Sequence, residues 1–314
     1  MVRGLGKARG RHDVFLIRPE GGAGRRTSYL TAVTRLTRLL SSRKYDLVHA
    51  QYAHAGIVCA LAARLPLVLH IHGEFGYRDY EPRVPRGLGE RLLYFKDSLL
   101  ARIASRLADA TIVVNPHDLR HVRGRVRKCI PIGPDEGLFV PLDRAAACSE
   151  LGWGKDSLKV LFAGESTERL EKGYPLFRSI LDRLGALGVD VEEVIFRGYR
   201  HEEVPVLLNA VDLVILTSRT EASPTIVKEA NFCNLPVVST PVGDVEDQLD
   251  GISPGGVFPP DPDILAEAAA DILRGRNRSN GREMALEKWS LRTTVSRLLE
   301  TYSEVLANKR GGSA

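Results

Sequence analysis

Two glutamates flank the predicted start of a helix in the second half of the chain. Ser223 and Pro224 stand together, and this pair favours a helix start because serine caps a helix and proline fits its first turn. Such a start offers free N–H groups and a positive dipole end, which suit an anion such as a diphosphate. Glu221 precedes this start and Glu229 lies within the helix. Since carboxylates repel phosphate, we expect them to bind hydroxyl groups on either side of it, for example of a sugar and a ribose. An ordinary capped helix with two solvated glutamates fits the same spacing.

The segments around this helix alternate between short apolar runs and longer helical patterns. Short runs rich in Val, Ile and Leu predict strands buried on both faces, and alternation with helices predicts parallel sheets. The predicted strands are residues 14–17, 47–50, 67–71, 111–114 and 126–132, then 159–163, 193–197, 213–217 and 236–239. The predicted helices are 27–41, 53–64 and 87–107, then 145–151, 175–187, 202–210, 224–232, 264–273 and 290–306. We therefore expect an α/β fold of two Rossmann-like doubly wound domains that face each other across a cleft, where ligands of such folds bind.

A break rich in glycine and proline, from Gly133 to Pro141, separates the two series of elements. We expect an N-terminal Rossmann-like domain at residues 1–137 and a C-terminal Rossmann-like domain at residues 138–290. We expect residues 291–314 to form a C-terminal helix that packs back on the first domain. Residues 1–130 contain 24 Lys and Arg against 10 Asp and Glu, whereas residues 131–314 contain 20 against 29. This asymmetry supports two domains, and the basic half suits an anionic partner.

The helix predicted at residues 87–107 carries one apolar stripe, which we expect to pack on the sheet. The stripe consists of Leu88, Leu92, Phe95, Leu99 and Ile103. A second interpretation is that this helix, with the Arg-rich stretch 78–91 before it, touches a membrane or an anionic lipid.

Neither a metal site nor a disulfide framework is indicated. The four cysteines, Cys59, Cys129, Cys148 and Cys233, form no C-x-x-C pair, which favours thiols in a reducing compartment. Residues 55–69 are the most apolar stretch, but Arg64 and Pro66 interrupt it, so it predicts no membrane-spanning helix. Without a recognisable signal peptide, we expect a cytoplasmic protein, with peripheral contact at the inner membrane face as a further hypothesis.

Several ordered motifs resemble those of the family 4 retaining glycosyltransferases. Glu221 and Glu229 match the E-x7-E pattern of this family. Other matches are Tyr45–Ala50, Ile71–Gly73, Gly133–Pro141, Leu161–Gly164, Lys172–Gly173, the S-P-T-I-V-K-E-A run, Cys233–Thr240 and Val242–Asp244. The resemblance covers roughly residues 44 to 308. It implies the GT-B fold, with residues 1–137 as the acceptor-side domain and residues 138–290 as the nucleotide-sugar-binding domain. It also implies no metal and no cofactor, with a nucleotide-diphosphate sugar as the donor substrate.

The resemblance also implies roles for single residues. Glu229 binds the ribose, and Glu221 contacts the donor sugar near its reacting carbon. His72, from the first domain, faces the sugar and stabilises charge in the oxocarbenium-like transition state. The remaining implied donor-site residues are the backbone N–H groups of Ala222, Ser223 and Thr225 at the diphosphate or sugar, Lys172 at the leaving phosphate, and Gly198 and Tyr199 at the base. His70 is interpreted as structural.

Two positions depart from the family pattern. Glu165 stands where the family has Arg or a similar residue, and we expect Arg169 to supply the missing positive charge. The start of the chain is short for the family, and the first domain is expected to lack its first strand. Gly21, Gly22 and Gly24 match no phosphate-loop pattern, so we interpret them as a turn.

Three functions remain open at this stage. The leading hypothesis is a metal-independent hexosyltransferase that moves sugar from a nucleotide donor to a saccharide or lipid-linked acceptor with retention, as in polysaccharide biosynthesis. A nucleotide-sugar epimerase of the same fold is the second, and a degenerate, non-catalytic subunit is the third. We expect no nucleic acid partner.

Overall fold

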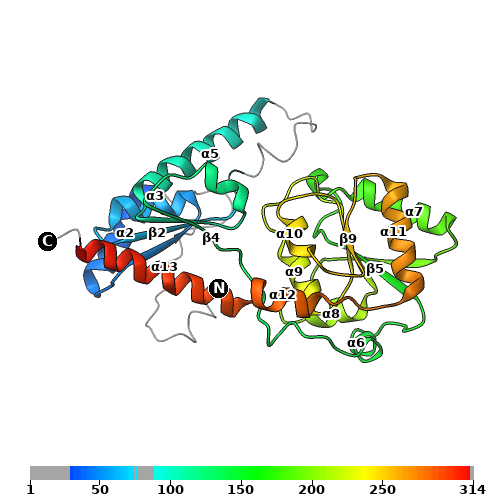
Figure 1. Cartoon of the computed structure of the whole chain (residues 1–314). Helices are drawn as coiled ribbons and strands as arrows, with labels where there is room; N and C mark the ends of the chain where they lie inside the picture. Colours follow the sequence, from blue (N-terminus) through cyan, green and yellow to red (C-terminus); the bar gives the residue numbers. More distant parts are fainter. Residues whose placement is uncertain (1–28, 74, 76–87, 312–314) are drawn as a thin grey trace. The chain divides into compact units, whose positions relative to one another are not determined.

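The computed structural model describes residues 29–73, 75 and 88–311 (Figure 1). The chain forms two compact units: residues 1–131 together with 294–314, and residues 132–293. The strand predicted at residues 14–17, the glycine turn after it and the short start of the chain lie outside the described residues. The Arg-rich stretch 78–91 also lies largely outside them. Each unit is an α/β fold around a parallel sheet, which confirms the predicted fold class.

Within its described residues, the first unit holds a sheet of four parallel strands in the order β1-β2-β3-β4. These are β1 (Val48–Gln51), β2 (Leu67–Ile71), β3 (Ala110–Val113) and β4 (Val126–Cys129). One face packs against α2 (Tyr29–Ser42), α3 (Ala53–Ala62) and α5 (Leu88–Leu107). The opposite face packs against α13 (Leu291–Gly311), which lies along the sheet in Figure 1. Alternate strand residues therefore serve two separate cores, as the pleat of a strand requires.

Five parallel strands form the sheet of the second unit, in the order β6-β5-β7-β8-β9. They are β5 (Leu158–Phe162), β6 (Val191–Ile195), β7 (Leu213–Leu216), β8 (Val237–Ser239) and β9 (Gly256–Val257). One face packs against α8 (Val204–Ala210), α9 (Thr225–Phe232), α10 (Val245–Leu249) and α12 (Gly281–Trp289). The other face packs against α7 (Tyr174–Ala186) and α11 (Pro262–Gly275), while α6 (Arg144–Glu150) packs on α8. Three of these elements, β9, α10 and α12, are not predicted by the sequence pattern, because they are short or weakly patterned.

The apolar stripe on α5 does not pack on the sheet, so that interpretation is wrong. Its described members are exposed by 60% at Leu92, 52% at Phe95, 46% at Leu99 and 39% at Ile103. Among the side chains of α5 that the structure describes, the buried ones are instead small: Ser98, Ala101, Ala104 and Ser105. Small residues allow α5 to approach α3 closely: a Cβ at Gly56 would lie 3.3 Å from the Cβ of Ala104. Close helix contact over small side chains thus decided which face of α5 is buried.

The start of α9 also differs from the prediction. Pro224 occupies the cap position with extended backbone (φ −65°, ψ 118°), and the helix begins at Thr225. Ser223 does not cap the helix, because its hydroxyl donates to Oδ2 of Asp244 at 2.8 Å. The hydrogen bond to Asp244, which is distant in sequence, therefore replaces the capping role that the local sequence predicts for Ser223.

Gly173, in a loop of the second unit, lies against the backbone at the end of β7, and replacing it tests how tightly the two segments pack. Gly173 has a φ of 70°, and a Cβ there would lie 1.9 Å from the carbonyl oxygen of Thr217. Gly188 has a φ of 74°, but a Cβ there would meet nothing within 4 Å. Gly188→Ala should therefore lower the free energy of unfolding by about 1–2 kcal/mol, the cost of a left-handed non-glycine residue. Gly173→Ala should cost at least about 2 kcal/mol more, because backbone must also move.

Urea unfolding of the two variants measures this difference. Equal losses in both would show that the contact between Gly173 and Thr217 is not tight.

Candidate functional site

The order of strands in the second unit marks where a ligand should bind. From β5 the chain first adds β6 on one side and later β7 on the other. The loops after β5 and β7 therefore separate at a topological switch point, where α/β sheets bind their ligands. The predicted donor residues Lys172 and Glu221 follow β5 and β7, respectively.

The structure brings these two residues together. Lys172 Nζ donates to Glu221 Oε1 at 2.7 Å, across 49 residues of sequence. The side chains are 21% and 17% exposed, respectively, so the pair is mostly shielded but open on one side. A cation and a carboxylate in contact at a switch point are suited to a ligand that carries both phosphate and hydroxyl groups.

Close backbone contacts hold Lys172 in place. Lys172 ends the 3-10 helix η2 (Leu170–Lys172), and Gly173 then lies against the carbonyl of Thr217. The Thr217 hydroxyl donates to the carbonyl of Lys172 at 3.3 Å, and the Arg219 N–H donates to the carbonyl of Glu171 at 2.8 Å. The loop after β5 is therefore joined to the end of β7 at several points.

The loop that carries Glu221 is held from the other side. Gly243 has a φ of 60°, and a Cβ there would lie 2.8 Å from the carbonyl oxygen of Ala222 and 3.1 Å from that of Glu221. The Thr240 hydroxyl donates to the carbonyl of Ser218 at 3.1 Å. The segment after β8 thus packs directly on the backbone that presents Glu221, Ala222 and Ser223.

A buried polar network fixes the start of α9. Lys228 is fully buried, and its Nζ donates to the Ser223 hydroxyl at 2.9 Å. Gln248 Nε2 donates to Asp244 Oδ1 at 2.6 Å, while Ser223 donates to the second oxygen of Asp244. Burial raises the pKa of Asp244 above its usual value, although Lys228 and the hydrogen bonds from Ser223 and Gln248 oppose this change. The network therefore places one cation and one acid directly beneath the proposed anion site.

The sequence alone predicts no role for Lys228, Asp244 or Gln248. Lys228 lies in the S-P-T-I-V-K-E-A run and Asp244 in the Val242–Asp244 segment, both of which resemble the family's motifs. This position within the motifs is the sequence feature that could have indicated a role at the site. Their burial was not evident, because Lys and Asp are usually exposed.

Glu229 lies on α9 and is partly buried. Burial raises its pKa to about 7, and the nearby Lys228 lowers it by a smaller amount. A carboxyl group whose pKa lies near 7 is partly protonated at neutral pH, so it can both accept and donate hydrogen bonds. This suits a pair of ribose hydroxyls.

The other predicted donor residues are placed as follows. Gly198 is exposed with a φ of 84°, and the ring of Tyr199 stacks on Phe196 at 6.5 Å between centroids. Arg169 pairs with Glu171 at 2.6 Å, and Glu165 is exposed. The structure therefore shows Arg169 bound to a neighbouring carboxylate, and its role at a phosphate stays a prediction.

His72 belongs to the first unit and directly follows β2. Its Nε2 lies 2.6 Å from Gln51 Oε1, and its ring lies 4.7 Å from that of Tyr52. Burial lowers the pKa of His72 to about 4. The ring is therefore neutral near pH 7, and it can act there as a hydrogen-bonding group rather than as a cation.

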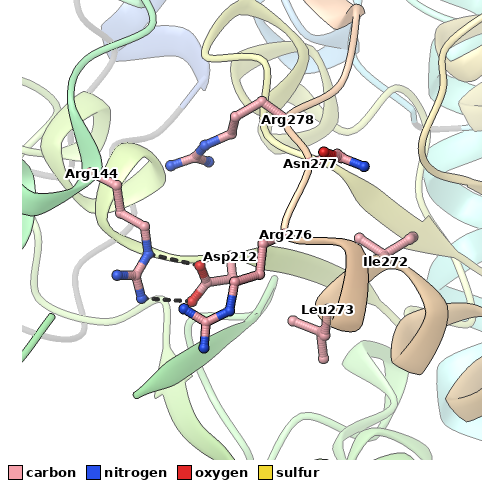
Figure 2. Close-up of a pocket in the computed structure, with 7 residues that line it drawn as sticks. All are labelled: Arg144, Asp212, Ile272, Leu273, Arg276, Asn277 and Arg278. Carbon is pink, nitrogen blue, oxygen red and sulfur yellow. Dashed lines mark hydrogen bonds and ion pairs between the residues drawn. The ribbon is translucent and has the colours of Figure 1, made fainter. Parts of the chain in front are cut away.

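A separate pocket of about 220 Å³ lies where the strands of the second sheet begin (Figure 2). Asp212, directly before β7, receives hydrogen bonds or ion pairs from Arg144 at 2.7 and 2.8 Å. Arg278 donates to the carbonyls of Asn209 and Val211, at the end of α8. These contacts anchor α6 to the start of β7 and the segment after α11 to the end of α8, whereas the predicted donor residues follow the opposite ends of the strands. We therefore interpret this pocket as structural.

Among the described helices, none is long and apolar enough to cross a membrane.

Two family models match the chain. The model described as glycosyltransferase family 4 matches residues 4–132, and the model described as glycosyl transferases group 1 matches residues 145–275. Together they span most of both units.

Curated relatives are similar over most of the chain. A D-inositol 3-phosphate glycosyltransferase of Saccharomonospora viridis is 26% identical, over 90% of this chain and 76% of the relative. The enzyme of the same name from Mycolicibacterium vanbaalenii is also 26% identical, over 85% and 68%. A GDP-mannose-dependent alpha-(1-6)-phosphatidylinositol monomannoside mannosyltransferase of Mycolicibacterium smegmatis is 31% identical, over only 42% and 38%.

Solved structures share the fold. Sucrose-phosphate synthase from Thermosynechococcus elongatus superposes with a TM-score of 0.71 at 20% identity, over 89% of this chain and 79% of that chain. Anabaena HepE, solved in complex with UDP and glucose, gives 0.62 at 21%, over 86% and 80%. At such identities the likeness concerns the fold alone.

The raised pKa of Glu229 predicts a pH-dependent stability. The folded protein holds a proton on Glu229 up to about pH 7, whereas an unfolded glutamate loses it near its ordinary pKa of 4.5. The folded state therefore loses stability as the pH rises from about 4.5 to 7. Glu229→Gln removes this loss, so the variant should match the wild type at pH 4.5 and exceed its stability by about 2–3 kcal/mol at pH 8.

Urea unfolding at several pH values measures this gain. Glu267→Gln, on the exposed face of α11, is the matched control and should follow the wild-type curve. A gain at Glu229 that does not grow with pH would contradict the assignment.

Proposed function

We propose that this chain, which belongs to the family 4 and group 1 glycosyltransferases with the GT-B fold, transfers a sugar from a nucleotide-diphosphate sugar to a saccharide or lipid-linked acceptor. The observation that carries the proposal is the contact between Lys172 and Glu221 at the switch point of the second sheet. In this reaction the bond between the sugar C1 and the phosphate oxygen breaks. A new bond forms from C1 to an acceptor oxygen, which loses its proton, and the nucleoside diphosphate leaves.

The donor phosphates belong beside Lys172 and the loop before α9. Ala222, Ser223 and Thr225 offer backbone N–H groups at this helix start, and Lys172 adds a full positive charge. Negative charge grows on the leaving phosphate as the bond breaks, so fixed donors and a cation there stabilise the transition state. We propose that Lys172 supplies the charge that a metal ion supplies in other transferases, and that no metal takes part.

Glu221 and Glu229 belong to the two ends of the donor. Glu221 touches Lys172 and therefore lies near the phosphate next to the sugar, where its carboxylate can accept from sugar hydroxyls. Glu229 lies further along α9 and suits the ribose. HepE, of the same fold, was solved with UDP and with UDP-glucose, and a relative is named as GDP-mannose-dependent. Both nucleotide classes are therefore candidates for this chain, with the base bordered by Gly198 and Tyr199.

Retention of configuration is proposed from the E-x7-E resemblance. The same resemblance makes His72 the second proposed catalytic residue, with a neutral ring that can form hydrogen bonds to the sugar.

The acceptor belongs to the first unit, whose sequence is strongly basic. The relatives that match along most of the chain are named for D-inositol 3-phosphate, so an acceptor with a phosphate group fits both observations. We propose a phosphorylated or lipid-linked acceptor for this chain as well.

The exposed face of α5 supports contact with an anionic membrane. Leu92, Leu99 and Ile103 are at least 39% exposed along one side of the helix, and Lys96 and Arg106 are exposed on the same helix. An apolar stripe flanked by cations suits insertion at the surface of an anionic bilayer. Such contact would bring a lipid-linked acceptor to the enzyme.

Lys172→Met tests the donor site. Loss of a charged hydrogen bond costs about 1.5–3 kcal/mol, so the Kd for the cognate UDP- or GDP-sugar should rise about 10- to 100-fold in calorimetry. Lys155→Met, at an exposed lysine of the same unit, should leave the Kd unchanged. An unchanged Kd in the Lys172 variant would contradict this donor site. Formation of an isomeric nucleotide sugar without acceptor would instead support the epimerase.

Replacing two leucines tests the membrane contact. The double variant Leu92→Ser and Leu99→Ser should reduce cosedimentation with phosphatidylglycerol vesicles at least about tenfold, because each buried leucine contributes about 1.5–3 kcal/mol. Leu142→Ser, at a 44% exposed leucine of the second unit, should bind as the wild type does. Equal binding of the double variant would show that α5 does not insert.

A further inference from the structure

Three imidazole rings form a row on the face of the first sheet that α13 covers. His49 lies on β1, while His70 and His72 lie on and directly after β2. The rings of His49 and His70 stack at 5.6 Å between centroids, and those of His70 and His72 at 4.5 Å. Tyr302, from α13, lies edge-on to His49 at 5.6 Å.

Hydrogen bonds connect Tyr302 to His72 along this row. The Tyr302 hydroxyl lies 2.6 Å from His49 Nδ1. His49 Nε2 lies 3.2 Å from Gln51 Nε2, and Gln51 Oε1 lies 2.6 Å from His72 Nε2. The chain of contacts thus runs from the C-terminal helix to the proposed catalytic histidine through two residues of β1.

The orientation of the Gln51 amide determines where the protons lie, since proton positions follow from the hydrogen-bond network. An amide nitrogen only donates and an amide oxygen only accepts, while a neutral imidazole has one donor and one acceptor nitrogen. Burial lowers the pKa of both His49 and His72 to about 4, with a smaller contribution at His49 from the neighbouring His72, so both rings are neutral near pH 7.

His72 must therefore donate from Nε2 to Gln51, and Gln51 must donate to Nε2 of His49. His49 then carries its proton on Nδ1 and donates it to the Tyr302 oxygen. Burial also raises the pKa of Tyr302 to about 12. The hydroxyl therefore keeps its proton near pH 7, and its oxygen can accept the hydrogen bond from His49.

A second arrangement satisfies the same contacts with every bond reversed. The Gln51 amide turns over, Tyr302 donates to His49 Nδ1, and His72 carries its proton on Nδ1. Because the two ends of the amide differ, neither histidine can change its tautomer without the other.

We propose that Tyr302 is a positioning residue that, through His49 and Gln51, determines which ring nitrogen of His72 carries the proton. In the observed arrangement Nδ1 of His72 is the accepting nitrogen, which suits a donating hydroxyl of the sugar. This consequence for catalysis rests on the proposed function, whereas the control of the tautomer does not.

Tyr302→Phe keeps the ring and removes only the hydroxyl. His49 Nδ1–H then loses its acceptor, and a buried donor without an acceptor is destabilising. On His49 the reversed arrangement leaves only a lone pair unmet, which folded proteins tolerate better than an unmet donor. We therefore expect His72 to change from the Nε2–H to the Nδ1–H tautomer, with His49 changing in the opposite direction.

Nuclear magnetic resonance of the full chain with 15N-labelled histidine at pH 8 reads these tautomers directly. His49→Asn and His72→Asn assign the signals. Tyr29→Phe is the matched control, because Tyr29 makes a hydrogen bond to His54 that is separate from this chain of contacts. It should leave His72 unchanged.

Gln51→Glu provides a second, independent outcome and covers the case in which Tyr302→Phe does not fold. A carboxylate accepts at both ends, so His49 should now donate from Nε2 while His72 keeps its proton on Nε2. One ring changes in this variant, and both change in Tyr302→Phe. An unchanged His72 in folded Tyr302→Phe, or an unchanged His49 in Gln51→Glu, would overturn the proposal.

Kinetics separates this proposal from the proposed function. If only one tautomer is competent, kcat falls with its population, by about tenfold in Tyr302→Phe for a preference of 1.4 kcal/mol, and the KM for the donor stays constant. A structural role alone would lower the Tm without changing the tautomers. A tautomer change in a protein that transfers no sugar would support the control by Tyr302 and reject the transferase.

Discussion

The close approach of Gly173 to the carbonyl of Thr217 is the contact on which the donor site depends. It joins the loop after β5 to the end of β7, and a residue with a Cβ could not occupy it without a shift of the backbone. Lys172 is fixed as a result, next to Glu221. A cation held in advance by backbone packing needs little reorganisation when phosphate charge develops, which is the condition for effective electrostatic stabilisation.

A second constraint comes from charge that is buried beneath the same site. Lys228 is fully buried and lies 5.7 Å from the ring of Trp289, with the Ser223 hydroxyl as a hydrogen-bond acceptor. A buried charge is costly unless it is paired and hydrogen-bonded. Asp244 supplies the opposite charge through Ser223, so the loop after β8 and the start of α9 are held as one body. The helix start is thereby oriented before any ligand arrives.

The first unit shows how a late segment can reach an early site. Tyr302 contacts His49 across 253 residues of sequence, because α13 covers the sheet face opposite α3 and α5. The hydrogen-bonded residues His49, Gln51 and His72 lie on that face, because alternate residues of β1 and β2 point toward it. A helix from the end of the chain can therefore influence a histidine near its start.

Local pattern is sufficient for β1 to β8 of the described residues, because buried parallel strands are short apolar runs between helical stretches, whereas the two-residue β9 carries no such run. The sequence is also sufficient to indicate the family, because the ordered motifs that resemble it are visible in the sequence alone. Pattern does not reveal which face of α5 is buried, because periodicity defines a stripe and not the partner of that stripe; close packing of Gly56 and Ala104 decides that. Nor does it reveal that Ser223 bonds to Asp244 instead of capping α9. Both outcomes arise from contacts between segments distant in sequence, whose free energies outweigh local preferences of about 1 kcal/mol.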